Sequence, residues 1–134
     1  MIHLDTPFAI DLLRERARGK DGAATRWLRA HPEEELRVGV HVACELAAGA
    51  RLAPRAVEEE AKVRRLLAAV VLTYPDERFA DTYAEILAWL TPRGERISAM
   101  DALIATAALR DAAPLLTRNV REFERVPGLR VERY

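Results

Sequence analysis

Short apolar runs alternate along the chain with longer stretches in which apolar side chains recur every three or four residues. Each run has the length of a buried strand, and each longer stretch has the spacing of a helix with one buried face. Five runs are predicted to be strands: residues 1–4, 36–40, 68–73, 115–117 and 129–131. Strands that alternate with helices predict an α/β fold of three layers, with a mostly parallel sheet covered on both faces.

Helices are predicted in the intervals between these strands. Thr6 is expected to cap the first helix, with Pro7 as its first residue, where the missing N–H of proline costs little. Phe79 and Tyr83 begin an apolar stripe at helical spacing, which we interpret as core packing rather than as an aromatic binding surface. The predicted helices cover residues 7–19, 22–30, 41–51, 54–67, 79–93 and 98–112.

The composition predicts a single globular domain over residues 1–134. Half of the residues are hydrophobic (50%) and 31% are charged, and no stretch rich in Pro, Gly or Ser marks a linker. No apolar run approaches the ~20 residues of a membrane span, and the N-terminus lacks a signal-peptide pattern. Cys44 is the only cysteine, which excludes an internal disulfide. We therefore expect a cytoplasmic protein without a membrane partner.

The charges of the chain balance, and a net charge of +0 argues against strong nonspecific nucleic-acid binding by the whole surface. Their distribution is uneven. Residues 1–30 and residues 110–134 each carry six basic and four acidic groups, whereas residues 31–109 carry nine basic and thirteen acidic groups. A weakly basic rim formed by both ends would suit a phosphate backbone. A solvated surface of mixed sign explains the same counts, and we favour that interpretation.

Three carboxylates stand where a predicted strand gives way to a helix or where a helix begins. Asp5 follows the first strand, Glu45 lies just beyond the second, and Asp101 opens an apolar helix. In an open α/β sheet the strand ends converge on one crevice. Acids brought together there repel one another unless a cation neutralises them, and Mg²⁺ and Mn²⁺ prefer oxygen ligands. The pattern predicts a Mg²⁺ or Mn²⁺ site, while the scattered histidines have no zinc-type spacing.

Each acid also has a purely structural interpretation. Ser98 and Asp101 fit a capping box, in which Asp101 would only complete the helix start, and Asn119 and Glu122 fit the same pattern. An acid in a first helical turn gains roughly 0.3–1 kcal/mol from the helix dipole. Glu45 is harder to explain in this way, because its apolar neighbours in the sequence leave no obvious place for a solvated charge.

Four segments carry a family likeness when they are taken together. They are MIHLDT at residues 1–6, VACEL at 42–46, ISAMDALIATA at 97–107 and LTRNVREF at 116–123. These segments resemble PIN-domain proteins, and most of all the VapC-type toxins of bacterial toxin–antitoxin pairs. The likeness covers essentially the whole chain, including the closing RVPGLRV at residues 125–131. One Asp-Thr pair would be weak evidence, whereas four segments in order are strong evidence.

The resemblance implies a PIN-like α/β/α fold and a Mg²⁺-dependent endoribonuclease toxin, with Mn²⁺ as the other suitable ion. It also implies inhibition by a cognate VapB-like antitoxin, assembly as a homodimer, and contact with operator DNA only through the antitoxin. Asp5 and Asp101 are the expected direct metal ligands. Glu45 is expected to be a ligand through water or a base that orients the attacking water.

Other side chains of the same segments are expected to support these ligands or to touch the substrate. They are Thr6, Thr117, Arg118, Asn119 and Glu122. The two threonine hydroxyls and Asn119 would hold the ligands in place, and Arg118 would contact a phosphate. Asn119 is further expected to cap the short helix that follows it.

Two positions depart from the family pattern. Pro7 stands where asparagine is usual, and a first helical turn tolerates it. Asn119 stands where many members carry an aspartate. Either Asn119 or, through a water, Glu122 would then fill the fourth place of the site. The two departures leave a second interpretation open, a catalytically weak PIN-fold module that binds RNA or a partner protein.

Overall fold

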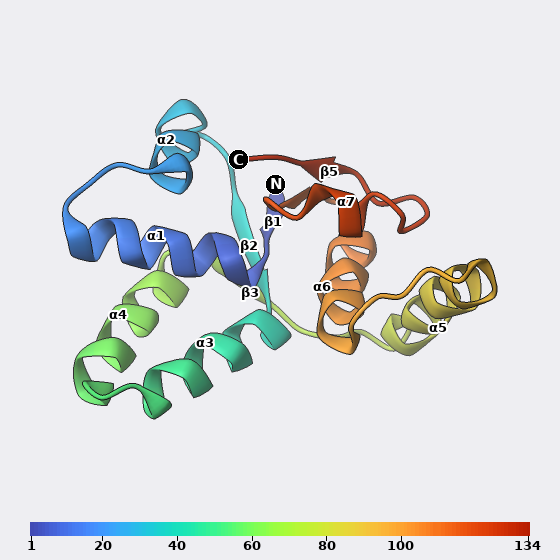
Figure 1. Cartoon of the computed structure of the whole chain (residues 1–134), viewed down its shortest axis with the longest axis horizontal. Helices are drawn as coiled ribbons and strands as arrows, with labels where there is room; N and C mark the ends of the chain where they lie inside the picture. The colour runs from blue at the N-terminus through green and yellow to red at the C-terminus, as the bar shows by residue number, and fades with distance from the viewer.

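A five-stranded sheet runs through the middle of the molecule, in a computed structural model that describes all of residues 1–134 (Figure 1). Every strand pair is parallel, and the order across the sheet is β3-β2-β1-β4-β5. The strands are β1 (Ile2–Leu4), β2 (Leu36–Gly39), β3 (Val71–Thr73), β4 (Leu115–Leu116) and β5 (Val131–Glu132). Because β1 is central, the residue that follows it lies at the middle of the sheet's carboxyl edge.

The sheet confirms the prediction of a mostly parallel arrangement, and two strands begin two or three residues later than predicted. The pattern predicts a strand from residue 68, whereas the structure keeps Ala68 in a helix and begins β3 at Val71. Alanine favours a helix, and Leu66 buries its side chain from the last turn of that helix, so the helix continues past the predicted boundary. The last strand likewise begins at Val131 rather than at residue 129.

Helices cover both faces of the sheet, as the three-layer prediction requires. Figure 1 shows α1, α3 and α4 on one side of the strands and α5 and α6 on the other. The helices are α1 (Thr6–Arg18), α2 (Ala23–Ala30), α3 (Val40–Leu52), α4 (Ala56–Ala68), α5 (Phe79–Leu90), α6 (Ala99–Arg110) and α7 (Val120–Phe123), with a 3₁₀ turn η1 (Thr91–Arg93). None of them has the length and apolar character that crossing a bilayer requires.

Helix α6 packs closely on the sheet because most of its buried side chains are small. Its buried residues are Ala102, Ile104, Ala105, Thr106, Ala107 and Ala108. At the end of β2, a Cβ added to Gly39 would lie 3.1 Å from the Cβ of Ala107, which is tighter than ordinary van der Waals contact. This close packing fixes α6, whose first turn carries Asp101, on the sheet.

Helix α1 begins one residue earlier than predicted, and a different residue caps it. Thr6 is the first helical residue and Pro7 the second, whereas Asp5 occupies the cap position. The Oδ1 atom of Asp5 accepts a hydrogen bond of 2.8 Å from the backbone N–H of Phe8. The expectation that Thr6 is the cap is therefore wrong. Asp5 has the better geometry, because its backbone is still extended as β1 ends.

Helix α2 begins at Ala23 without a capping side chain of its own, since its cap residue is Gly22. Glu15 of α1 takes this role across the turn. Its carboxylate accepts hydrogen bonds from the backbone N–H groups of Ala24 (3.1 Å) and Thr25 (2.8 Å), and from the Thr25 hydroxyl. A Cβ at Gly22 would collide with this carboxylate, so glycine leaves it the space it needs.

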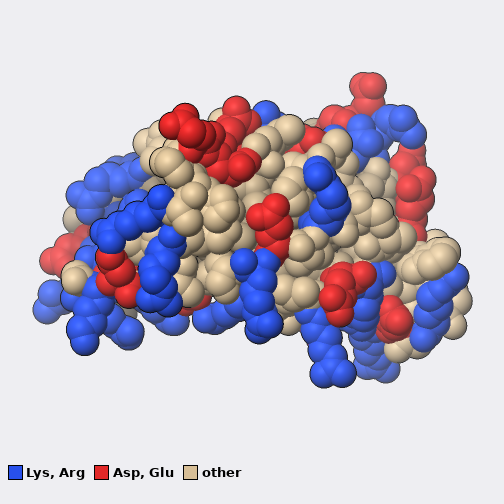
Figure 2. All heavy atoms as spheres, turned by 90° about the horizontal axis from the view of Figure 1, so that it is seen from above, with Lys and Arg blue, Asp and Glu red and all other residues tan.

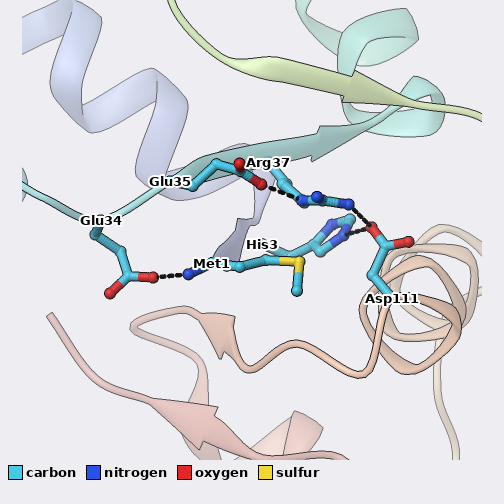
Figure 3. A network of polar contacts seen from close by, with 6 residues as sticks. All are labelled: Met1, His3, Glu34, Glu35, Arg37 and Asp111. Atoms are coloured by element: carbon cyan, nitrogen blue, oxygen red, sulfur yellow. Dashed lines mark hydrogen bonds and ion pairs between the residues drawn. The ribbon is translucent and has the colours of Figure 1, made fainter.

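A second long-range contact ties the end of α6 to the central strands (Figure 3). His3 of β1 is buried, and its Nε2 lies 2.6 Å from the Oδ2 of Asp111, which follows α6. Arg37 of β2 donates to the same oxygen at 3.3 Å. Burial lowers the pKa of His3, although the Asp111 carboxylate opposes this effect. The neutral imidazole, Asp111 and Arg37 thus connect α6 to two adjacent strands.

We predict that Glu15→Ala lowers the free energy of unfolding by about 1 kcal/mol, the usual loss when a helix cap is removed. Glu15→Gln is expected to fall between this variant and the wild type, because one amide oxygen replaces two carboxylate oxygens. Urea unfolding followed by circular dichroism measures both. Glu77→Ala is the control, since Glu77 is exposed in a loop. Equal stabilities of Glu15→Ala and the control would contradict this role.

Candidate active site

Asp5 lies at the end of the central strand and is almost completely buried, with 1% of its surface exposed. One carboxylate oxygen, Oδ1, caps α1 through the Phe8 N–H. The other oxygen, Oδ2, is buried and has no hydrogen-bond partner. A buried carboxylate oxygen without a donor is costly to leave unsatisfied. Such an atom is therefore available to a proton or to a cation.

The pKa of Asp5 is raised to about 6, and burial is the main cause. The Asp101 carboxylate raises it further. The Thr117 hydroxyl, which lies near the carboxylate but makes no hydrogen bond to it, acts in the opposite direction, as do the Phe8 N–H and the Arg118 guanidinium, because each favours the charged form. Two of the predicted site residues, Asp5 and Asp101, are thus close enough to interact electrostatically, and Thr117 and Arg118 adjoin them.

Asp101 occupies the first turn of α6 and is half-buried. Its backbone N–H donates to Ser98 Oγ at 3.1 Å, which is the cap contact that the sequence predicts. The pKa of Asp101 is also raised. Burial is again the largest cause, Ser98 opposes it, and the carboxylates of Glu45 and Glu122 add to it. The Asp101 carboxylate therefore completes no helix cap. It lies near other acids, which disfavour its charged form.

Glu45 lies on α3 and is exposed, contrary to the expectation that a solvated charge has no place among its apolar neighbours. The helix turns Val42 and Leu46 toward the core and leaves Cys44 and Glu45 on its outer face. The carboxylate is nevertheless held in place, because Oε1 accepts a hydrogen bond of 2.7 Å from the hydroxyl of buried Thr6. The structure thus brings together Thr6 and Glu45, which the sequence analysis assigned separate roles in the site.

The segment between β4 and α7 supplies the other predicted residues. Thr117 is completely buried, and its Oγ1 accepts a hydrogen bond of 2.9 Å from the backbone N–H of Asn119. The Asn119 side chain is exposed and makes no cap hydrogen bond, so the prediction that it caps the following helix is wrong. Thr117 holds the turn instead, because its hydroxyl lies inside the turn.

Arg118 and Glu122 of the same segment point outward, and each forms an ion pair with another residue. Arg118 Nη1 donates to Asp11 Oδ2 at 2.9 Å. Glu122 is partly exposed, forms an ion pair with Arg125 and raises the pKa of Asp101. Of the two candidates for the fourth place, Glu122 therefore interacts electrostatically with the acids, and Asn119 has no charge with which to do so.

These acids suit a divalent cation in chemistry but do not form a finished cage. No group of three or more His, Cys, Asp or Glu side chains is arranged to hold a metal ion. Asp5 and Asp101 as direct ligands, and Glu45 as a ligand through water or a base, therefore remain predictions. The free Oδ2 of Asp5 and the disfavoured charge of Asp101 still fit a hard cation, and Mg²⁺ usually keeps several waters.

The face drawn in Figure 2 carries charges of both signs. Figure 2 shows Lys and Arg side chains gathered along the lower border of one face, with Asp and Glu side chains between them and above them. No patch of one sign covers this face. On this face, attraction of a phosphate therefore depends on individual arginines rather than on a patch of one sign.

Sequence reasoning missed two residues next to the site. Asp11 of α1 and Tyr134 form a hydrogen bond of 2.8 Å between Asp11 Oδ2 and the tyrosine hydroxyl, and Asp11 also pairs with Arg118. The contacts join residues 107 and 123 positions apart. No local pattern signals such a contact, so the sequence offered nothing from which to predict it.

Comparison with known proteins shows the following similarities. A family model described as PIN domain matches residues 2–129. A VapBC2 structure from Rickettsia felis, bound to a DNA fragment from its promoter, is 23% identical with a TM-score of 0.89, covering 100% of this chain and 99% of the other. VapBC-1 from nontypeable Haemophilus influenzae is 29% identical with a TM-score of 0.83, covering 99% and 98%.

A third similar structure is VapC20 from Mycobacterium tuberculosis, described as a toxin that cleaves the sarcin-ricin loop. It is 21% identical with a TM-score of 0.61, and the match covers 88% of each chain. The comparison with curated proteins gave no match. The PIN-like fold inferred from the four sequence segments is confirmed by the family match and by these structures.

We predict that Asp5→Asn stabilises the metal-free protein at pH 7 by up to roughly 3 kcal/mol, because burial raises the pKa of the wild-type carboxyl from 3.8 to about 6. A carboxyl whose folded pKa is raised destabilises the fold once it ionises, so wild-type stability falls as the pH rises from about 4 to about 6. Asparagine keeps the oxygen that caps α1 and cannot ionise.

Urea unfolding in the presence of a chelator, at pH 4 and at pH 7, measures this difference. The gap between Asp5→Asn and the wild type is expected to open as the pH rises and to close at pH 4. Asp81→Asn, which removes an exposed carboxylate of α5, serves as the control. Parallel pH profiles for wild type and Asp5→Asn would show that the ionised Asp5 does not strain the fold.

Proposed function

Because the chain belongs to the PIN-domain family, we propose that it is a metal-dependent endoribonuclease and the toxin of a toxin–antitoxin pair. The observation that carries this proposal is the coupling of Asp5 and Asp101 at the carboxyl edge of the sheet, with one buried carboxylate oxygen left free. The similar VapBC structures support the toxin role, and VapC20, described as a toxin that cleaves the sarcin-ricin loop, supports RNA as the substrate.

Mg²⁺ is the proposed ion, with Mn²⁺ as the alternative, and Asp5 and Asp101 are its proposed ligands. Glu45 and Glu122 are further carboxylates close enough to raise the pKa of Asp101. A bound divalent ion supplies a nucleophilic water near neutral pH and stabilises negative charge on the phosphate. Carboxylate oxygens suit such an ion better than the nitrogen or sulfur ligands that zinc prefers.

The other residues of the site orient the reactants. Thr6 holds the Glu45 carboxylate, which is exposed and can therefore accept a proton from the attacking water. The Phe8 N–H holds Asp5 in one orientation, and Thr117 keeps the β4–α7 turn against it. Arg118 binds a phosphate oxygen with the N–H groups that its ion pair leaves free.

A groove beside the site suits the proposed antitoxin. It has a volume of about 350 Å³ and lies between α1, α3 and α4, with Ile10, Leu13, Leu46 and Val63 among its lining residues. Glu45 also lines it, so the groove leads to the acids. An amphipathic helix of VapB type would bury its apolar face there and place a Lys or Arg beside the carboxylates. Contact with operator DNA would come only through this antitoxin.

A catalytically weak module that binds RNA or a partner is the second candidate. It is favoured by the acids that do not form a ready three-ligand group, and by Asn119 in place of a fourth acid. The first candidate explains more, because a binding module has no use for a buried, unpartnered carboxylate oxygen. Homodimer formation belongs to the same proposal, and light scattering of the purified protein measures it.

The proposal predicts cleavage of RNA that requires Mg²⁺ and Asp5. Brief expression of the wild type should produce new RNA 5′ ends at defined positions, and expression of Asp5→Asn should produce none. The purified wild type should cleave the mapped RNA with Mg²⁺ and stop when a chelator is added. Asp81→Asn is the control that keeps activity. Mapped ends that are identical for wild type and Asp5→Asn, or cleavage that survives the chelator, would refute the proposal.

The two candidates for the fourth place predict different mutant phenotypes. Glu122→Gln should lower the cleavage rate by about tenfold to a hundredfold and weaken Mg²⁺ binding, because it removes a negative charge that raises the pKa of Asp101. Asn119→Ala should change cleavage and stability little, because the side chain makes no cap hydrogen bond. Single-turnover cleavage and calorimetric Mg²⁺ titration measure both, with Glu124→Gln as the control. The reverse ranking would assign the fourth place to Asn119.

If the antitoxin binds in the groove, a substitution there should weaken inhibition without changing RNA cleavage. Ala17 is exposed and lines the groove, so Ala17→Glu should weaken antitoxin binding by about tenfold or more while RNA cleavage stays the same. Ala47→Glu, on the exposed side of α3 and outside the groove, is the control. Binding of the protein encoded by the adjacent small gene, measured by calorimetry, checks this. Unchanged affinity in Ala17→Glu would place the antitoxin elsewhere.

A further inference from the structure

Three segments that are far apart in the sequence meet at the carboxylate of Asp11. This residue lies on α1, and its Oδ2 atom accepts two hydrogen bonds. One comes from Arg118 Nη1 at 2.9 Å, and the other comes from the Tyr134 hydroxyl at 2.8 Å. Arg118 belongs to the β4–α7 segment of the site, and Tyr134 follows β5. The contact therefore joins α1 to two strand ends on one side of Asp5.

The tyrosine is held by its ring as well as by its hydroxyl. The ring of Tyr134 packs edge-on against Phe8, with 4.8 Å between the ring centroids and 83° between the planes. Phe8 is completely buried and lies in the first turn of α1, three residues after Asp5. Such edge-to-face contacts favour one ring orientation. The Tyr134 hydroxyl is thus directed at Asp11 by a rigid neighbour.

The three residues also lie near the acids of the site. The charge of Arg118 is one of the influences that lower the pKa of Asp5. Burial raises the pKa of Tyr134, and the hydrogen bond to Asp11 and the charge of Asp5 raise it further, so its hydroxyl keeps its proton and remains a donor. Asp11 for its part is largely covered, with 19% of its side chain exposed.

Arg118 is anchored at one end and free at the other. Its side chain is 58% exposed, and its one hydrogen bond is the contact from Nη1 to Asp11. A guanidinium has five N–H donors in a planar fork, and the geometry leaves the remaining ones for another acceptor. A phosphate bound by two of them would be recognised in a bidentate manner.

We propose that Asp11 and Tyr134 are positioning residues, which hold Arg118 beside Asp5 so that its free N–H groups bind a phosphate of the RNA substrate. This role rests on the proposed function. An unrestrained arginine side chain loses considerable rotamer freedom when it binds a ligand. Anchoring by Asp11 removes part of that loss before the RNA arrives, and the Tyr134 hydrogen bond keeps Asp11 itself in one rotamer.

A purely stabilising ion pair is the competing explanation. Pairs with one largely exposed partner contribute little to folding, since solvent screens them and ordering the side chains costs entropy. Asp76 and Arg110 form such a pair elsewhere on the surface, with a shortest distance of 2.7 Å. This pair provides the matched control, because it has the same chemistry and no part in the site.

The test is a double-mutant cycle on cleavage of a labelled RNA oligonucleotide that spans the mapped cleavage position. Asp11→Asn should raise KM about threefold to tenfold with kcat almost unchanged, the pattern of lost uniform binding. Tyr134→Phe, which keeps the ring, should raise KM less. Arg118→Ala should raise KM at least as much as Asp11→Asn, and adding Asp11→Asn to Arg118→Ala should have no further effect. Asp76→Asn should leave KM and kcat as they are.

Salt dependence provides a second readout that a structural role would not move. Arg118→Ala should reduce the slope of log KM against log salt by about one, the change expected when one phosphate contact is lost. Asp11→Asn should reduce the slope by less. The positioning role would be overturned if Asp11→Asn raised KM equally in the wild type and in Arg118→Ala, or if it left KM unchanged. Either result would leave the proposed function intact. If the wild type does not cleave RNA at all, the proposed function fails and this role fails with it.

Discussion

The site and the fold both depend on the burial of one ionisable group, Asp5, at the end of the central strand. Its two oxygens have separate tasks, since Oδ1 begins helix α1 and Oδ2 remains without a donor. A side chain that starts a helix cannot rotate away to reach solvent, so the free oxygen stays buried. The strain of a carboxylate with a raised pKa is therefore built into the start of α1. Proteins tend to keep such strain where a ligand relieves it.

The sequence predicted the architecture well because the decisive signals were local. Apolar runs of strand length gave all five strands, and their separation by helices gave the parallel sheet that the structure has. Where the prediction failed, two local signals competed. Ala68 could end a helix or begin a strand, and helix propensity decided. Asp5 and Thr6 are both good caps, and the extended backbone of Asp5 at the strand end decided.

The site was predicted only in part, because burial and long-range contacts leave no local trace. Apolar neighbours in the sequence suggested no place for a solvated Glu45, yet the helical period of about 3.6 residues puts Val42 and Leu46 inside and Glu45 outside. The Asn119 cap failed because Thr117, two residues earlier, offered a buried hydroxyl to the same turn. The carboxylates of Asp11 and Glu15 lie on one predicted helix, and nothing in that pattern tells which partner each one finds.

The balance of charge around Asp5 limits what can bind there. Asp101 acts against its ionisation, while the one nearby cation, Arg118, is directed by Asp11 and gives Oδ2 no hydrogen bond. The free oxygen is then satisfied by a proton, by a metal ion or by a basic side chain from a partner, and these exclude one another. Under the proposed function, a partner that brings a single Lys or Arg into the site would therefore act in two ways. It would neutralise the repulsion that favours metal binding, and it would occupy the oxygen that the metal needs, so inhibition would require no change in the fold.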